Sequence, residues 1–200
     1  MDMGSSLIRD GYDVVAQSYL ADRDKLKSGK YLQQLLKYLP KHATILDLGC
    51  GAGVPVDDVL LKAGHRVIGV DISSEQIKLA RRRVPGGEYI VGDIQELTPS
   101  EYSVQAIVSF YAIFHIPRER QLAWFKTIAT YLSKGGILLV TMGDREFEGS
   151  HILHGQPMWS SQYGTAKNRQ MIETAGFKIL VDELDTSGGE RHQAIMGERV

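Results

Sequence analysis

The stretch ILDLGCGAGVPV, residues 45–56, decides the fold of this 200-residue chain. It opens as a largely apolar strand that contains Asp47, and glycines follow at alternate positions, Gly49, Gly51 and Gly53. Glycine reaches positive φ and has no Cβ, so a ligand can approach the backbone closely where the next helix begins. The same kind of turn also occurs where a strand and a helix pack tightly without any ligand.

The second strand of the pattern, RVIGVD, ends at Asp71, eighteen residues after Gly53. An acidic side chain about 20 residues beyond such a turn accepts hydrogen bonds from ribose hydroxyls. Asp71 also precedes Ser73 and Ser74, where a carboxylate favours a helix N-terminus without any ligand. The two roles are compatible, and together the turn and the carboxylate predict an adenosine-cofactor site within residues 44–71.

The spacing of the glycines separates two kinds of cofactor. Nicotinamide dinucleotide sites use G-x-G-x-x-G, which seats a pyrophosphate on the helix N-terminus, whereas the third glycine here comes one residue earlier. Asp47, two residues before the first glycine, suits a cofactor with positive charge better than a pyrophosphate. An NAD-dependent oxidoreductase therefore stays as the second hypothesis, behind an enzyme with a cationic adenosine cofactor.

Apolar, β-branched runs alternate with helix-period segments along the rest of the chain, which indicates a mainly parallel sheet covered on both faces. The predicted strands are 43–48, 66–70, 88–91, 104–109, 136–142, 177–181 and 191–196. Ser73 and Gln76 match a capping box at the start of one crossover helix, and Gly135 and Gly176 are predicted helix stops. The stretch 143–164 shows no clear periodicity.

Composition and charge narrow the class of protein. With 43% hydrophobic and 24% charged residues the chain fits one globular domain, and its net charge of -1 argues against binding nucleic acid or an anionic membrane by bulk electrostatics. A single cysteine, Cys50, excludes an internal disulfide and fits a reducing compartment. No apolar run approaches the roughly 18 residues of a membrane span, and no signal-peptide pattern opens the chain. We therefore expect a soluble, cytoplasmic protein with no nucleic-acid or membrane partner.

The glycine turn and the segments that follow it resemble the class I S-adenosylmethionine-dependent methyltransferases, whose first motif is an acidic residue followed by G-x-G-x-G. Asp47 and the three glycines match that motif. The second and third motifs of the family resemble VIGVDIS at 67–73 and YIVGDIQEL at 89–97. Its fourth strand and GG-led fifth strand resemble AIVSFYAIFHI at 106–116 and LSKGGILLVTM at 132–142. The resemblance covers residues 40–196, to within a few residues.

The resemblance implies an α/β fold: a doubly wound, three-layer αβα domain with a seven-stranded sheet in the order 3-2-1-4-5-7-6, strand seven antiparallel. It also implies S-adenosyl-L-methionine as the cofactor, S-adenosyl-L-homocysteine as its product, and in-line transfer of a methyl group to a small-molecule nucleophile. By this resemblance Asp71 takes the ribose and Asp93 lies near the adenine amino group. The other implied cofactor residues are Ile72 beside the adenine, Ile94 against its ring, and Ser109 and Phe110 after strand four.

Ahead of the first strand, Tyr12, Val15, Ala16 and Tyr19 recur with helical spacing and predict an apolar, aromatic stripe, which packing alone would explain. The segment GYDVVAQSYLADR also resembles the YDxxAxxY leader helix that closes over the cofactor in many small-molecule methyltransferases, so Tyr12 and Tyr19 are candidate lid residues. We expect one domain, residues 1–200, with a helical lid at 8–40 and an acceptor-pocket insertion at 143–164.

Methyl transfer needs little catalytic machinery, because the sulfonium is already activated and the enzyme mainly aligns a nucleophile with the methyl carbon. A base is needed only where the acceptor must lose a proton. His115, after strand four, is the candidate base, and a histidine that packs or caps the helix at Pro117 fits the sequence nearly as well. The segment 109–112, SFYA, departs from the Asn/Asp-Pro-Pro-Tyr/Phe motif of many nucleic-acid and protein amino methyltransferases, which disfavours those substrates.

In the resembling family the acceptor pocket often lies in the segment that matches 143–164, between strand five and the helix that begins near Thr165. The candidate pocket residues here are Tyr111, His115, His151, Trp159 and Tyr163. His151 and His154 lack a third clustered ligand, so a mixed polar and aromatic loop is favoured and no metal is expected. Cys50 lies in the turn where a helix N-terminus could activate a thiolate. A non-catalytic module that binds a partner protein through the leader helix or this loop is the third hypothesis, and the sequence leaves monomer and homodimer open.

Overall fold

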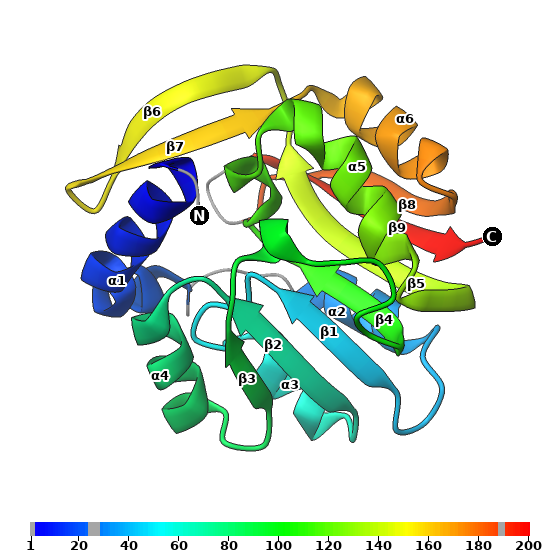
Figure 1. Cartoon of the computed structure of the whole chain (residues 1–200). Coiled ribbons are helices and arrows are strands. Elements are labelled where there is room, and N and C mark those ends of the chain that lie inside the picture. The colour runs from blue at the N-terminus through cyan, green and yellow to red at the C-terminus, as the bar shows by residue number, and fades with distance from the viewer. Residues whose placement is uncertain (1–2, 24–28, 188–190) are drawn as a thin grey trace.

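The structure is a computed structural model that describes residues 3–23, 29–187 and 191–200. Its helices are α1 (Met3–Arg23), α2 (Gly29–Leu36), α3 (Val56–Lys62), α4 (Ser74–Arg83), α5 (Arg118–Ala129) and α6 (Thr165–Thr174), with short 3-10 turns η1 (Ile94–Glu96) and η2 (Ile113–His115). Its strands are β1 (Thr44–Leu48), β2 (Arg66–Asp71), β3 (Glu88–Val91), β4 (Val104–Ser109), β5 (Leu132–Gly143), β6 (Phe147–Leu153), β7 (Gln156–Gln162), β8 (Phe177–Asp185) and β9 (His192–Arg199). Figure 1 shows their arrangement.

Seven strands form one sheet in the order β3-β2-β1-β4-β5-β9-β8. The strands from β3 to β5 pair in parallel, and β9 is antiparallel to both of its neighbours. All seven predicted strands are present, and the predicted order with its antiparallel last strand is confirmed. Strand order reverses between β1 and β4, which is where an open α/β sheet places its ligand, beyond the carboxyl ends of the strands.

Helices cover both faces of the sheet, and on each face an apolar layer is buried between the sheet and the helices. One layer lies between the sheet and helices α5 and α6; its fully buried members include Ile107, Phe125, Ile128, Leu138 and Ile172. The other lies between the sheet and helices α2 and α3; its fully buried members include Leu32, Leu35, Ile45, Leu60 and Ala106.

Within the stretch 143–164, residues 147–162 form a β-hairpin, so the prediction of a loop was wrong there. Strands β6 and β7 pair antiparallel with each other and stay outside the main sheet. They are joined through His154 and Gly155, whose φ angles of 46 and 81 degrees match the positive-φ pair of a two-residue hairpin turn. The hairpin packs on α1, and Figure 1 shows the two side by side at one end of the sheet. Within the described ranges no helix is both long and apolar enough to span a membrane.

The predicted start and stop signals of the helices are confirmed only in part. Ser73 caps α4, because the Gln76 backbone N–H donates to its Oγ at 3.1 Å. The second half of the capping box is absent, since the Ser73 N–H already donates to Asp71 Oδ1 at 2.9 Å. Gly176 follows α6 as predicted, whereas Gly135 lies inside β5, because α5 already ends at Ala129.

Candidate functional site

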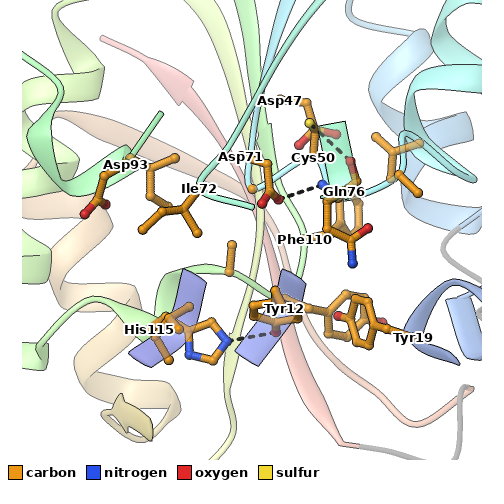
Figure 2. A pocket seen from close by; sticks show the side chains of 18 of the residues that line it. Tyr12, Tyr19, Asp47, Cys50, Asp71, Ile72, Gln76, Asp93, Phe110 and His115 are labelled. Atoms are coloured by element: carbon orange, nitrogen blue, oxygen red, sulfur yellow. Dashed lines mark hydrogen bonds between the residues drawn. The ribbon is translucent and has the colours of Figure 1, made fainter. Parts of the chain in front are cut away.

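A cavity lies at the carboxyl ends of β1, β2 and β4, where strand order reverses. Figure 2 shows two sides of it, with Asp47 and Asp71 on one side and Tyr12, Tyr19 and His115 on the other. The predicted site residues that line it are Tyr12, Tyr19, Asp47, Gly49, Gly51, Asp71, Ile72, Asp93, Ile94, Phe110, Tyr111 and His115. The structure therefore brings most of the predicted residues into one place.

The glycine turn shapes the floor of the cavity. Gly49, Gly51 and Gly53 have φ angles of 82, 54 and 75 degrees, in the left-handed region that side chains disfavour. A Cβ built on Gly49 would lie 2.3 Å from the Cβ of Ala112, so only glycine fits there. Gly53 does not line the cavity; a Cβ there would meet the Tyr89 hydroxyl at 2.9 Å, so packing beneath the turn requires this glycine.

Asp71 holds the turn and the β2–α4 connection together. Its Oδ2 accepts the Gly51 N–H at 2.8 Å, and its Oδ1 accepts the Ser73 N–H at 2.9 Å. Charge-assisted hydrogen bonds of this kind fix the carboxylate in one orientation at the edge of the cavity. The structural role that the sequence suggested for Asp71 is therefore present, and its place in the cavity keeps the ribose role open to it.

Two polar side chains present unfilled hydrogen-bonding groups to the cavity. Asp93 accepts the Gln95 N–H at 2.9 Å through Oδ1, while its buried Oδ2 has no partner in the described part of the chain. Gln76 is 1% exposed, lines the cavity, and has neither its amide oxygen nor its amide nitrogen paired within the described residues. Buried polar groups normally find partners, so these groups indicate a polar ligand. Gln76 was missed because the sequence assigned it to the capping box.

The charges around the cavity decide which ligand fits. Three carboxylates line it, those of Asp47, Asp71 and Asp93, and no lysine or arginine does among the residues that the structure describes. A pyrophosphate would therefore meet carboxylates without a cationic side chain, whereas a positively charged tail would be stabilised. Ile72 and Ile94 supply apolar surface for a flat base. The residues present fit S-adenosylmethionine.

A second acidic group, Asp57, lies beneath the turn and was not singled out from the sequence. Asp57 is 0% exposed and Asp47 is 2% exposed. Burial raises the pKa of Asp57 well above its usual range, and the neighbouring Asp47 carboxylate raises it further. Burial and the carboxyl groups of Asp57, Asp71 and Asp47 also raise the pKa of the Cys50 thiol. Cys50 therefore stays a thiol, and the suggestion of an activated thiolate was wrong.

His115 is held by both of its ring nitrogens. Nδ1 lies 2.8 Å from the backbone oxygen of Trp159, and Nε2 lies 2.9 Å from the Tyr12 hydroxyl. Burial lowers the pKa of His115 to about 4; the hydrogen bond to Trp159 opposes this change and the charge of His151 adds to it. The imidazole is therefore neutral near pH 7.

Helix α1 is tied to the cavity wall at several points. Gln95 Nε2 donates to the Ser5 hydroxyl at 3.2 Å, Tyr12 bonds His115, and the Ser73 hydroxyl donates to Asp13 at 2.6 Å. On the hairpin side, a Cβ on Gly11 would lie 2.6 Å from the Met158 Cε, so helix and hairpin are in close contact. Both suggested roles of this helix, packing and covering the cavity, are thus compatible with the structure.

The remaining predicted residues lie outside the cavity. Ser109 is fully buried and donates its hydroxyl to the Leu48 carbonyl at 2.7 Å, which ties β4 to β1. Trp159 contributes its backbone carbonyl to His115, and His151 lies opposite Met158 in the hairpin. The Tyr163 ring lies 5.6 Å from the Arg118 guanidinium. None of these four residues lines the cavity.

Comparison with known proteins agrees with this geometry. A family model described as "Methyltransferase domain" matches residues 45–136. A trans-aconitate 2-methyltransferase of Variovorax paradoxus is 28% identical over 133 residues, 64% of this chain and 51% of that protein. A Dictyostelium discoideum protein named "Probable 18S rRNA (guanine-N(7))-methyltransferase" is 34% identical over 102 residues, 46% of this chain and 35% of that protein. The chain spans about half the length of the first curated relatives it matches.

Solved structures share the fold. The 1,6-didemethyltoxoflavin-N1-methyltransferase of Burkholderia thailandensis superimposes with a TM-score of 0.73 at 16% identity, covering 96% of this chain and 84% of that one. At this identity the likeness concerns the fold alone. Sheet order, glycine turn and the match of residues 45–136 to the methyltransferase model therefore agree with the resemblance of this chain to the class I, Rossmann-like S-adenosylmethionine-dependent methyltransferases.

Proposed function

We propose that the chain transfers a methyl group from S-adenosylmethionine to a small-molecule nucleophile. The observation that carries this proposal is the charge of the cavity: three carboxylates line it without a lysine or arginine from the described residues. That arrangement favours a cationic adenosine cofactor over a nicotinamide dinucleotide. A dehydrogenase is accordingly disfavoured.

The proposed roles of the residues follow from their places in the cavity. Asp71 accepts hydrogen bonds from the ribose hydroxyls, Asp93 takes the adenine amino group at its unpaired Oδ2, and Ile72 and Ile94 hold the adenine ring. Asp47 lies in β1, just before the glycine turn, and stabilises positive charge on the far part of the cofactor. When bound, the cofactor supplies an activated methyl group, and the chain positions an acceptor toward it.

The acceptor side is proposed to lie between the end of β4 and helix α1. Phe110, Tyr111, Tyr12 and Tyr19 line the cavity there and provide an aromatic surface. Helix α1 and the hairpin together form a cap over this side, with α1 as the lid proposed from the sequence. An aromatic, capped space without cationic side chains suits a small molecule better than a polynucleotide, whose phosphates need Lys or Arg partners.

Transfer of labelled methyl groups tests the proposal. The chain would be incubated with S-adenosylmethionine carrying a tritiated methyl group and a panel of small phenols, hydroxy acids, amines and tricarboxylates including trans-aconitate, with total RNA as a separate acceptor. We expect label in at least one small product and none in RNA. Label in RNA alone would contradict the acceptor class. Binding of S-adenosylhomocysteine without any labelled product would favour the non-catalytic module.

A further inference from the structure

Tyr12, His115 and the Trp159 carbonyl form a chain of hydrogen bonds between the cavity and the hairpin. The heavy-atom distances are 2.9 Å from the Tyr12 hydroxyl to Nε2 and 2.8 Å from Nδ1 to the carbonyl oxygen. A carbonyl oxygen only accepts, so the hydrogen of the neutral imidazole is on Nδ1. Nε2 then carries a lone pair, and the Tyr12 hydroxyl donates to it. The direction of both hydrogen bonds is fixed.

Neither nitrogen of His115 is open to a substrate in this arrangement, although the histidine lines the cavity. Tyr12 also lines the cavity, and Figure 2 shows the hydrogen bond between its hydroxyl and His115. Its ring is held edge-on by Tyr19 and by His115, with centroids 5.2 and 5.5 Å away and interplanar angles of 70 and 81 degrees. A phenolic oxygen that donates one hydrogen bond still has lone pairs, so it can accept a proton while giving its own away.

We propose that Tyr12 is the catalytic acid–base residue of this enzyme and that His115 is the positioning residue that receives the Tyr12 proton. The inference rests on the proposed function and deepens it. It assigns the acceptor to small molecules whose nucleophilic group must lose a proton, such as a hydroxyl, because only these acceptors need such a relay.

The proton and charge balance closes without a further reactant. The acceptor O–H bond breaks, its proton passes to the Tyr12 oxygen, and the Tyr12 proton passes to Nε2 of His115. The acceptor oxygen forms a bond to the methyl carbon, while the carbon–sulfur bond breaks with its electron pair on sulfur. The positive charge that began on the sulfonium ends on the imidazolium, whose Nδ1–H donates to the Trp159 carbonyl. Release of that proton to water restores the resting state.

The surroundings of the pair suit this role. A neutral His115 is the form that can receive a proton, and its lowered pKa favours release of that proton after the step. Tyr12 belongs to α1, and Asp13 beside it accepts the Ser73 hydroxyl at the start of α4. The relay is therefore complete only when α1 is seated on the cavity. Proton transfer is thereby coupled to closure of the cap.

Two phenols of similar shape separate a relay from a structural contact. 4-Methylphenol keeps its proton near pH 8, whereas 4-nitrophenol has largely lost it, so only the first needs a base. We expect Tyr12→Phe to lower kcat for 4-methylphenol on the order of 100-fold, with kcat for 4-nitrophenol within about threefold of the unsubstituted enzyme. Tyr38→Phe, at a tyrosine that is 51% exposed, is the matched control and should change neither rate. Equal loss on both phenols, or no loss on either, would overturn the relay.

A spectroscopic measurement keeps the relay and the proposed function separable. Nitrogen-15 spectra of the histidines, recorded with S-adenosylhomocysteine bound, should show neutral His115 with its hydrogen on Nδ1. The Nε2 signal should move in Tyr12→Phe and stay in Tyr38→Phe. A His115 with its hydrogen on Nε2, or an Nε2 signal indifferent to Tyr12→Phe, would overturn the relay whatever the acceptor panel shows. Binding of S-adenosylhomocysteine without turnover of any acceptor would instead defeat the proposed function.

Discussion

The cofactor side of the cavity and the cap over it are built in different ways. The cofactor side consists of short segments that each follow a strand of one parallel sheet, and Asp47, Asp71 and Asp93 lie in or just after β1, β2 and β3. The cap consists of α1 and the β6–β7 hairpin, which meet each other through Gly11 and Met158 and touch the sheet side through Tyr12 and His115. The first is fixed by sheet topology, the second by contacts between residues far apart in the chain.

The difference assigns separate tasks to the two regions. Rigid strand ends hold the cofactor groups in place, because each is fixed by sheet pairing and by backbone hydrogen bonds such as those to Asp71. The cap is tied on by a few side-chain contacts, which is typical of a part that opens and closes. Substitutions on the cofactor side should therefore weaken cofactor binding more than substitutions in the cap.

The largest expected effect is at the glycine turn. Gly49→Ala should weaken S-adenosylhomocysteine binding on the order of 100-fold, because the new Cβ would lie 2.3 Å from that of Ala112 and φ is 82 degrees. Gly64→Ala is the control, since φ there is 87 degrees and nothing lies within 4 Å of a new Cβ. Calorimetric titration of both variants measures the effect. Equal affinity in both would show that the turn does not form the floor of the site.

A smaller loss of cofactor affinity is expected at Asp71, whose carboxylate joins the glycine turn to the β2–α4 connection. Asp71→Asn removes one of two charge-assisted acceptors for Gly51 and Ser73 and should cost roughly 1–3 kcal/mol of cofactor binding. Asp58→Asn removes a surface carboxylate that pairs with Lys62 and should leave affinity unchanged. Titration with S-adenosylhomocysteine compares them. An Asp71→Asn affinity matching that of Asp58→Asn would restrict Asp71 to a structural role.

The stability of the folded chain should depend on pH through His115, which lies between the cofactor side and the cap. The pKa of His115 is lowered to about 4 in the folded chain, so the unfolded chain binds the proton more readily and stability falls as pH drops from 6.5 toward 4. His115→Gln should make this acid-induced loss of stability smaller by roughly 2 kcal/mol. This figure is below the one that the full pKa difference implies, because the ring is partly exposed. His65 and His151, whose pKa values are also lowered by burial, stay in both proteins and cancel in the difference. Urea unfolding at several pH values tests this, and parallel curves would contradict it.

The smallest effect concerns the contact inside the cap. Gly11→Ala places a Cβ 2.6 Å from the Met158 Cε, and Met158→Ala removes that neighbour. The flexible methionine can give way, so Gly11→Ala should cost only about 1 kcal/mol, and the loss should disappear in a Met158→Ala background. Urea unfolding of the four proteins gives the coupling energy. Additive effects would mean that α1 and the hairpin do not meet at this point.

The same contrast explains what the sequence could predict. The strands and the acidic groups at their ends follow local patterns, since buried parallel strands are apolar runs and the glycine turn is a contiguous motif. The order of the strands was predicted only from the family resemblance. The hairpin was missed because its buried positions include Ser160 and Ser161 as well as Met158, which hides the alternation. Its turn uses His154 and Gly155 rather than the Asn-Gly pair that usually signals a hairpin. Asp57 went unrecognised because its surroundings come from distant segments, and Gln76 because the capping-box pattern already accounted for it.

The central claim is that the cavity binds S-adenosylmethionine rather than NAD. Comparing how much each kind of ligand stabilises the folded chain tests this claim most directly. Thermal unfolding would be followed with S-adenosylhomocysteine and with NAD at equal concentrations. The charge of the cavity predicts that S-adenosylhomocysteine raises the Tm and NAD does not, because only a ligand that binds the folded chain stabilises it. A rise with NAD and none with S-adenosylhomocysteine would contradict the account.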